Sequence, residues 1–289
     1  MRLTELSRER REQWESGWRE RPGWREPARR GVFVEWKAWG VEVDGRDVGT
    51  VAVGFSPSDL PMGVFIDDIH IEPNERGRGY GRAARELVTR WALEREATQI
   101  RVMTEPTNEA LTRLFADYDV ASRHKRLTVR AEDGGPDDAI APMTPKEYPR
   151  WLGLMIDDFA TSLATRDGVS MDQALAQADE LIKVMLPDEA ATSGNELWTL
   201  AVDGEPAAYL WLHPRPDVDE VYVQDVVVEE KLRGRGLGRR VMRRAATSAL
   251  TLGLSSVRLH VFAHNTTANA LYDRMGYRTV TEYRSASLT

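Results

Sequence analysis

One glycine-rich pattern occurs twice in this chain of 289 residues, and the distance between its copies constrains the fold more than any other feature. Arg76-Gly77-Arg78-Gly79-Tyr80-Gly81 returns 157 residues later (233 − 76) as Arg233-Gly234-Arg235-Gly236-Leu237-Gly238. At the same offset, residues 65–72 match residues 222–229, and Asn108 matches Asn265. Solenoid repeats are far shorter than this, and domains average roughly 150 residues. The repeat therefore predicts two similar domains in tandem.

Each copy of the pattern lies between an expected strand and an expected helix. The backbone N–H groups of a glycine-rich turn can point at one anion, and the helix N-terminus adds its positive end. No Gly-Lys-Ser/Thr follows either copy, which excludes a Walker A loop. In the second copy the spacing is GxGxG, and the acidic residue that a dinucleotide fold would require about 20 positions further on is not evident. We therefore expect a phosphate-binding turn in each unit.

Composition removes several classes of function. The net charge of −7 argues against a nucleic-acid partner, which normally needs a basic face. Without cysteine there is no disulfide, no thiolate metal ligand and no cysteine nucleophile, and the five histidines show no metal-ligand spacing. We expect no metal. The sequence has no apolar run that could span a membrane and no signal-peptide core, so we expect a cytoplasmic protein without a membrane partner. A monomer and a homodimer both remain open.

Local patterns predict an α/β chain with units at 1–132 and 143–289 and a polar linker over 133–142. The first unit is expected to have helices over 3–20, 79–96 and 108–117, and strands over 33–39, 48–55, 64–72, 99–104 and 123–131. The second unit is expected to have helices starting at 144–147 and at Ser170, then helices over 236–252 and 267–275, and strands over 196–202, 206–212, 220–228, 255–262 and 278–287.

The motif order of the second unit resembles the GCN5-related N-acetyltransferase (GNAT) superfamily. The residues that carry the resemblance are Val226-Val227-Val228, Arg233-x-x-Gly236-x-Gly238 and Asn265-x-x-Ala268-x-x-Leu271-Tyr272-x-x-x-Gly276-Tyr277. It runs from about Met143 to Thr289. It implies an α+β fold of two tandem domains, each a mixed, mostly antiparallel central sheet flanked by helices.

The resemblance also implies an N-acyltransferase that uses acetyl-CoA or another acyl-CoA as donor. The residues implied in donor binding are Val226, Val227, Val228, Arg233, Gly234, Arg235, Gly236, Leu237, Gly238, Arg239 and Asn265. The turn suits the pyrophosphate of CoA, and the valine strand can pair with the amides of the pantetheine arm. Asn265 has a structural alternative as a helix cap, and Arg239 has one as a solvated helix residue.

Transfer to an amine needs a base, an oxyanion donor and an acid. A base is expected near the strand that precedes the turn, and Asp225 is the first candidate and Glu229 the second. The N–H of Val226 or Val228 would stabilise the oxyanion by analogy with the family, and Tyr272 matches the tyrosine that protonates the leaving sulfur. Asp225 as a surface or salt-bridged residue and Tyr272 as a core residue are the structural alternatives. Without cysteine, direct attack in a ternary complex is favoured over an acyl-enzyme.

The first unit departs from this pattern at the position of the acid. Phe115 stands where Tyr272 stands in the second unit, and phenylalanine cannot donate a proton. The glycine turn and Asn108 are intact, and Asp67-Asp68 could serve as a base, but Tyr118 could act as the acid only if its helix shifted. We therefore expect the second unit to be catalytic and the first to be non-catalytic.

The acceptor is a primary amine of a small molecule or a peptide. Acidic residues near the expected site favour a cationic amine: Asp157, Asp158, Asp172, Asp179, Glu180, Asp217, Asp219 and Glu220. The alternative is that these carboxylates only solvate helix faces. Two other functions stay open, a catalytically weak acyl-CoA-binding sensor or scaffold and a mycothiol synthase-like acetyltransferase, whose tandem arrangement is similar.

Overall fold

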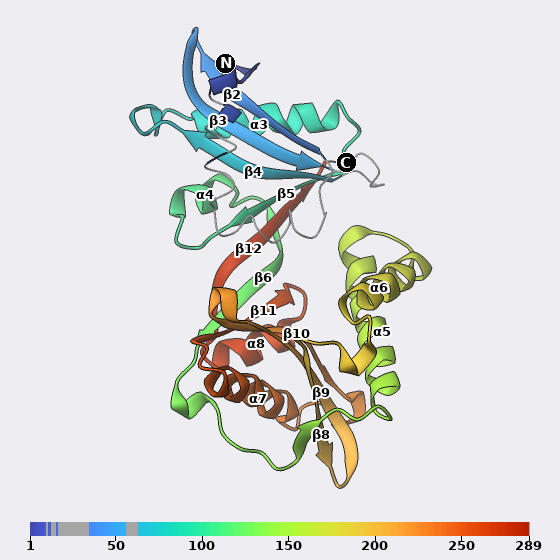
Figure 1. The fold of residues 1–289 in the computed structure, drawn as a ribbon. Helices are drawn as coiled ribbons and strands as arrows, with labels where there is room; N and C mark the ends of the chain where they lie inside the picture. The colour runs from blue at the N-terminus through green and yellow to red at the C-terminus, as the bar shows by residue number, and fades with distance from the viewer. Residues whose placement is uncertain (10, 13–15, 17–34, 56–62, 289) are drawn as a thin grey trace. The chain divides into compact units, whose positions relative to one another are not determined.

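The computed structural model describes residues 1–289 apart from residues 10, 13–15, 17–34, 56–62 and 289 (Figure 1). The chain divides into two compact units. Unit 1 contains Met1–Val120 and Thr281–Thr289, and unit 2 contains Ala121–Val280. Within the described residues, no helix is both long enough and apolar enough to cross a membrane.

Unit 1 is a mixed sheet in the order β1-β2-β3-β4-β5-β12. Neighbouring strands are antiparallel except β4 and β5, which are parallel. The strands are β1 (Arg2–Glu5), β2 (Glu35–Val43), β3 (Arg46–Phe55), β4 (Gly63–Ile71), β5 (Gln99–Thr104) and β12 (Arg278–Ser287). Two helices follow the central strands, α3 (Tyr80–Leu93) and α4 (Glu109–Leu114).

Unit 2 repeats this plan in the order β6-β11-β10-β9-β8-β7, with only β10 and β11 parallel. Its strands are β6 (Asp119–Thr128), β7 (Ile140–Pro142), β8 (Glu196–Val202), β9 (Glu205–Arg215), β10 (Glu220–Val228) and β11 (Ser256–Phe262). Its helices are α5 (Tyr148–Asp167), α6 (Met171–Met185), α7 (Leu237–Thr251) and α8 (Thr266–Arg274). The expected fold class, two similar mixed and mostly antiparallel sheets with flanking helices, is confirmed.

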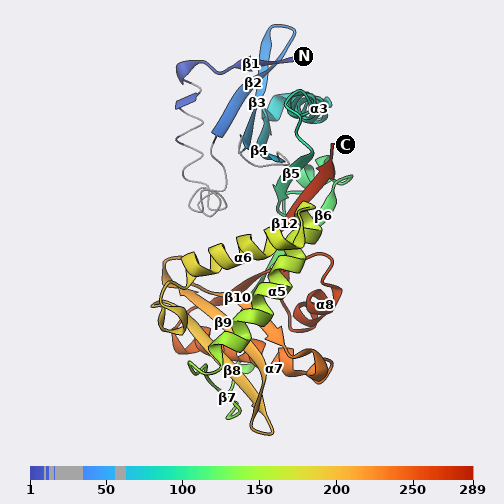
Figure 2. The same ribbon diagram turned by 90° about the vertical axis from the view of Figure 1, so that its right-hand side faces the viewer.

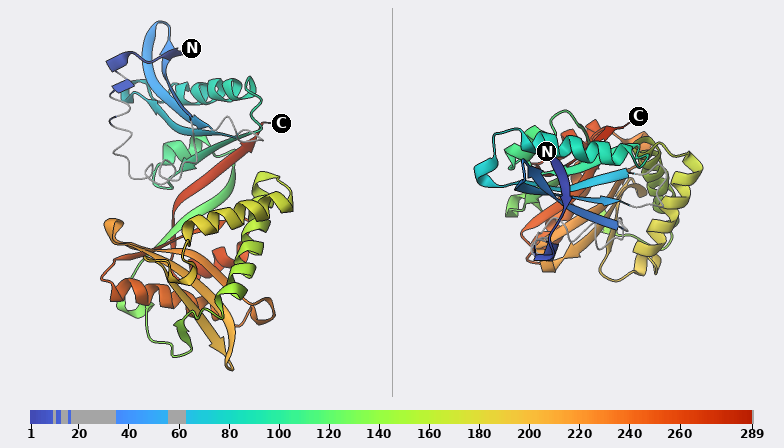
Figure 3. Two further views of the ribbon diagram at one scale, coloured as in Figure 1. Left: turned by 45° about the vertical axis from the view of Figure 1, so that its right-hand side comes forward. Right: turned by 90° about the horizontal axis from the view of Figure 1, so that it is seen from above.

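The last strand of each repeat belongs to the other unit. β6, from the first repeat, pairs with β11 in unit 2, and β12, from the second repeat, pairs with β5 in unit 1. The green β6 therefore does not pair with β5, the strand before it in its own repeat, and the red β12 does not pair with β11 (Figures 1 and 3). The expectation that the strand over 123–131 closes the first unit was wrong. Residues 1–132 and 143–289 do not coincide with the two compact units.

Several local elements also differ from expectation. Residues 3–5 lie in β1, not in a helix, because a short edge strand pairs with β2 there. Further along the expected helix over 3–20, residues 8, 9, 11, 12 and 16 are helical, and residues 10, 13–15 and 17–20 lie outside the described residues. β7 forms inside the expected linker and pairs with β8. The capping box at Ser170 is confirmed, since Ser170 accepts from the Gln173 N–H and Gln173 accepts from the Ser170 N–H.

Helices cover both faces of the unit 2 sheet. α5 packs on β9 and β10 through a cluster that includes Trp151, Tyr209, Trp211 and Val227. α7 and α8 pack on the opposite face, over β8 to β11. Figure 2 shows α5 and α6 in front of these strands and α7 behind them. The two faces therefore have separate cores, and the strands between them can carry groups toward either side.

Candidate functional site

The glycine-rich turn of unit 2 leads directly into α7. Gly234 and Gly236 have φ of 78° and 79°, a left-handed conformation that glycine adopts without strain. Gly236 is the N-cap of α7, and the helix has no side-chain cap. Within the described part of the chain, the N–H groups of residues 234–238 have no hydrogen-bond acceptor. The turn therefore presents unpaired donors at a helix N-terminus, which suits the pyrophosphate of CoA.

Arg233 and Leu237 have structural roles inside this turn. The Arg233 Nε donates to the Val228 carbonyl at 3.2 Å, and Arg76 makes the equivalent bond to Ile71 at 2.9 Å. The Leu237 side chain is buried in the core below α7. The arginine ties the turn to the preceding strand, and Leu237 can contribute to an anion site only through its backbone.

β10 separates from β11 beside this turn. Their parallel pairing runs from Glu220 to Val223 and then ends, and the register between β10 and β9 shifts at Gln224. The equivalent shift in unit 1 falls at Asp67 between β4 and β3. A bulge bends its strand and disrupts the ladder locally. Residues 225–228 therefore have one edge that β11 does not cover.

Strand alternation identifies which residues face that open edge. The Glu229 N–H donates to Ala207 of β9, so Glu229, Val227 and Asp225 direct their backbone groups toward β9. Val226 and Val228 direct theirs toward the open edge. Of the three valines expected to contact the donor, Val227 is thus placed to pair with β9, and its side chain lies in the core beneath α5.

Asp225 lies where the two strands separate. The Trp151 Nε1 of α5 donates to its Oδ2 at 2.9 Å. The pKa of Asp225 is raised to about 7, chiefly by burial, with a smaller contribution from the charge of Asp158 and against the hydrogen bonds from Trp151 and Val226, which lower it. Part of the residue remains exposed. Trp151 was not expected at the site, because only tertiary packing brings α5 against β10.

Tyr272 lies on α8 with only 7% of its surface exposed. Burial raises the pKa of its phenol above the ordinary value, and the charge of Asp225 raises it further. The carboxylate of Asp225 is therefore close enough to act on the ionisation of the phenol. The ring also packs against Tyr277 at a centroid distance of 5.7 Å. Its phenol remains protonated at neutral pH, as a proton donor requires.

The other predicted groups divide into engaged and available side chains. Glu229, the second candidate base, is buried and forms a two-point ion pair with Arg150 at 2.7 and 2.9 Å. The Asn265 Oδ1 caps α8 by accepting from the Ala268 N–H at 3.0 Å. Arg235 and Arg239 are exposed. An engaged carboxylate makes Glu229 a poorer base than Asp225.

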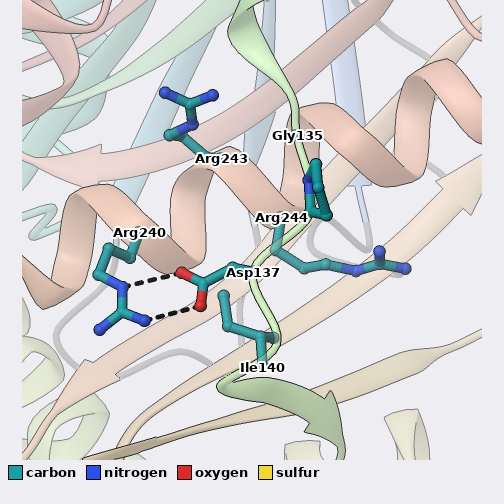
Figure 4. Close-up of a pocket in the computed structure, with 7 residues that line it drawn as sticks. Gly135, Asp137, Ile140, Arg240, Arg243 and Arg244 are labelled. Atoms are coloured by element: carbon teal, nitrogen blue, oxygen red, sulfur yellow. Dashed lines mark hydrogen bonds and ion pairs between the residues drawn. The ribbon is translucent and has the colours of Figure 1, made fainter.

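Arg240 is held away from the turn by an ion pair. Its Nε and Nη2 donate to Asp137 at 2.8 and 2.7 Å, beside a cavity of about 300 Å³ on the outer side of α7 (Figure 4). The Arg243 and Arg244 side chains point in other directions, and Arg244 stacks over Trp198. These contacts fasten residues 134–140 to α7.

Unit 1 places apolar groups at the position of the phenol. Phe115 is fully buried and packs edge-on against Tyr118 at 5.1 Å. Burial raises the pKa of Tyr118, and the cation of Arg85 lies 5.4 Å above its ring. Tyr118 is thus a core residue of unit 1 and does not replace Tyr272.

Several of the acidic residues expected near the acceptor are engaged elsewhere. Asp219 accepts from the backbone and hydroxyl of Ser255, and Asp179 pairs with Lys183 along α6. Glu220 is buried and pairs with Arg215 and Arg126. These three carboxylates are thus held by local partners, and Asp158 is the member of the group that acts on Asp225.

Known proteins resemble this chain along both units. The model of the family described as "Acetyltransferase (GNAT) family" matches residues 3–118 and 166–277. The uncharacterized N-acetyltransferase YdgE of Bacillus subtilis is 30% identical over 141 residues, which cover 48% of this chain and 90% of that protein. Mycothiol acetyltransferase of Clavibacter michiganensis is 26% identical over 243 residues, covering 81% of this chain and 74% of that protein. A GCN5-related N-acetyltransferase structure from Sphaerobacter thermophilus shares the fold, with a TM-score of 0.57 at 16% identity over 87% of this chain and 81% of that one.

Proposed function

The chain belongs to the acetyltransferase (GNAT) family, and we propose on that premise that unit 2 transfers an acyl group, acetyl by preference, from acyl-CoA to a primary amine. The observation that carries the proposal is the placement of Asp225. Its carboxylate is held by Trp151 where β10 leaves β11, and it is close enough to Tyr272 to raise the pKa of the phenol.

The turn and the open strand edge support donor binding. The unpaired N–H groups of residues 234–238 would hold the pyrophosphate, and the backbone groups of Val226 and Val228 would pair with the pantetheine amides. Asn265 can contribute its amide nitrogen while its oxygen caps α8. The donor supplies an acyl group activated as a thioester.

The side chains supply the proton transfers of a direct reaction between amine and thioester. Asp225, whose pKa is about 7, takes a proton from the ammonium form of the acceptor, and the neutral amine attacks the thioester carbonyl to form the C–N bond. As the tetrahedral adduct collapses, the C–S bond breaks, Tyr272 gives its proton to the departing sulfur, and the second proton lost by the nitrogen restores the phenol. The products are an amide and a free thiol, and Asp225 releases the first proton to solvent.

Unit 1 does not complete this set of groups. Its turn keeps the left-handed Gly77 and Gly79, with φ of 77° and 82°, but Phe115 replaces the phenol. We therefore assign the reaction to unit 2 and give unit 1 a non-catalytic role. A catalytically weak CoA-binding sensor is the contrasting function, and it requires CoA binding without turnover.

The test is thiol release from acetyl-CoA with a panel of primary amines, including an amino-thiol to cover a mycothiol synthase-like activity. Tyr272→Phe should lower kcat by about 10²-fold or more, whereas Tyr118→Phe, the matched variant in unit 1, should change it less than about twofold. Equal losses in both variants would contradict the assignment to unit 2. CoA binding by calorimetry without release from any amine would favour the sensor.

A further inference from the structure

A second polar group of residues lies on the sheet face that Asp225 occupies. Alternate residues of β11 pack in the core beneath α7, namely Val257, Leu259 and Val261. Arg258 and His260 therefore face the opposite side, toward α5 and α6. The pairing with β6 places Arg126 opposite Arg258 and His124 opposite His260. Four cross-strand neighbours thus share the face of Asp225.

These side chains contact one another closely. The Arg258 Nη2 lies 2.6 Å from the His124 Nδ1. A guanidinium only donates, so Nδ1 accepts and the proton of this ring lies on Nε2. His124 also packs edge-on against His260 at 5.4 Å and against Tyr222 at 6.2 Å. The orientation of Arg258 is therefore fixed by an imidazole and not by an acid.

The charges in this group do not balance. Glu220 is shared by the guanidiniums of Arg215 and Arg126. Among the residues that the structure describes, no carboxylate lies within ion-pair distance of Arg258, and its Nε is buried without an acceptor. An unsatisfied buried donor on a cation is costly, and a bound anion would satisfy it.

The excess positive charge lies a short way along the strand from the candidate base. Tyr222 of β10 is in register with Arg258, and Asp225 follows three positions later across the bulge. At about 3.3 Å per residue with one residue bulged, the separation is roughly 7–10 Å. Asp158 lies near Asp225 at the other end. One end of the face thus suits an ammonium group and the other an anion.

Resting on the function proposed above, we infer that the acceptor is a primary amine that also carries a carboxylate or a phosphate, and that Arg258 binds this anion. The planar guanidinium matches either group in a two-point contact. His124 orients the guanidinium, and Arg126 adds positive charge beside it. The acceptor is therefore zwitterionic in character, in place of the purely cationic amine that the acidic residues favoured.

The test compares matched amines that differ only in the anionic group. The pairs are 6-aminohexanoate with 6-aminohexanamide, and glucosamine 6-phosphate with glucosamine, so that the two pairs distinguish a carboxylate from a phosphate. With acetyl-CoA, the wild type should prefer the charged member of at least one pair by about tenfold or more in kcat/KM. Arg258→Gln should lower kcat/KM for the charged member by about 10- to 100-fold, mostly by raising KM. Arg258→Lys should retain part of the preference.

Arg101 occupies the equivalent position on β5 of unit 1, and Arg101→Gln is the matched control, with no expected change in preference. Equal kcat/KM for both members of both pairs in the wild type would overturn the inference while leaving the acyl transfer intact. Equal losses of kcat/KM for charged and uncharged amines in Arg258→Gln would overturn it as well.

Binding of the same compounds is measured separately by calorimetry with CoA present. Binding of a charged amine that depends on Arg258, without thiol release from any amine, would refute the transferase and retain the anion site. The failure of one proposal is therefore distinguishable from the failure of the other.

Discussion

Asp225→Asn separates the roles of this carboxyl in catalysis and in stability. Burial holds its pKa at about 7, against an ordinary value of 3.8, so the difference is about 3 units. At about 1.36 kcal/mol per unit, ionising the folded protein costs about 4 kcal/mol relative to ionising the unfolded chain. Asparagine keeps an oxygen for the Trp151 N–H and removes the charge.

The sign of the stability effect follows from where the proton is retained. Between pH 3.8 and about 7 the unfolded chain has lost this proton and the folded protein still holds it. This carboxyl therefore makes the wild type less stable as the pH rises through that range. The free energy of unfolding of Asp225→Asn, relative to that of the wild type, should therefore increase by about 2–3 kcal/mol from pH 5 to pH 8. Urea unfolding of both proteins at each pH measures this difference.

The activity of the wild type should rise with pH over the range in which its stability falls. The wild-type kcat/KM should fall about tenfold per pH unit below pH 7, because the base must be ionised. Asp225→Asn should lose about 10²- to 10⁴-fold near pH 8 and should lose the pH dependence that Asp225 causes, with the same amine used throughout. If the difference in free energy of unfolding between variant and wild type stays constant with pH, the raised pKa of Asp225 is refuted. If the variant keeps full activity, the role of Asp225 as the base is refuted.

Two further predictions concern the turn and the support of α8. Gly236→Ala places a Cβ in open space but forces a left-handed alanine, at about 1 kcal/mol, and should raise the KM for acetyl-CoA by about tenfold or more, whereas Gly79→Ala, in the unit proposed as non-catalytic, should leave that KM unchanged. The reverse order would place the reacting donor in unit 1. Lys125 is buried and pairs with the mostly exposed Asp273 of α8 at 2.6 Å. Asp273→Asn should therefore lower the free energy of unfolding by about 1–3 kcal/mol, and adding Lys125→Met should recover part of that loss. Additive losses in the double variant would contradict coupling between the two residues.

The sequence was most informative where structure is set by near neighbours. The bounds of β8, β10 and β12 were predicted to the residue, because apolar alternation and turn residues define a strand locally. The capping box at Ser170 was predicted for the same reason, since its hydrogen bonds span three residues. Glycines at 234 and 236 likewise indicated a turn between a strand and a helix, and both residues have the left-handed φ that glycine tolerates.

Features that depend on tertiary packing were not predicted. The strands β6 and β12 end two copies of one pattern, so each fits either sheet by alternation, and the sequence does not state which partner it takes. The contact of Trp151 with Asp225 spans 74 positions and two elements. The position of Glu229 directly after β10 made it a candidate base. Only the structure shows that Arg150 is bound to its carboxylate.

The exchanged strand explains why the first repeat, which has Phe115 in place of Tyr272, still matters to the candidate site. β6 comes from the first repeat, yet it lies beside β11 and contributes Leu127 to the core beneath α7. It also carries Lys125, which holds α8 and therefore Tyr272, and His124, which orients Arg258. In the function proposed above, phenylalanine at position 115 leaves the first repeat without a proton donor, and the second repeat still depends on the last strand of the first. The two copies can diverge in function while neither sheet is complete without the other copy's strand.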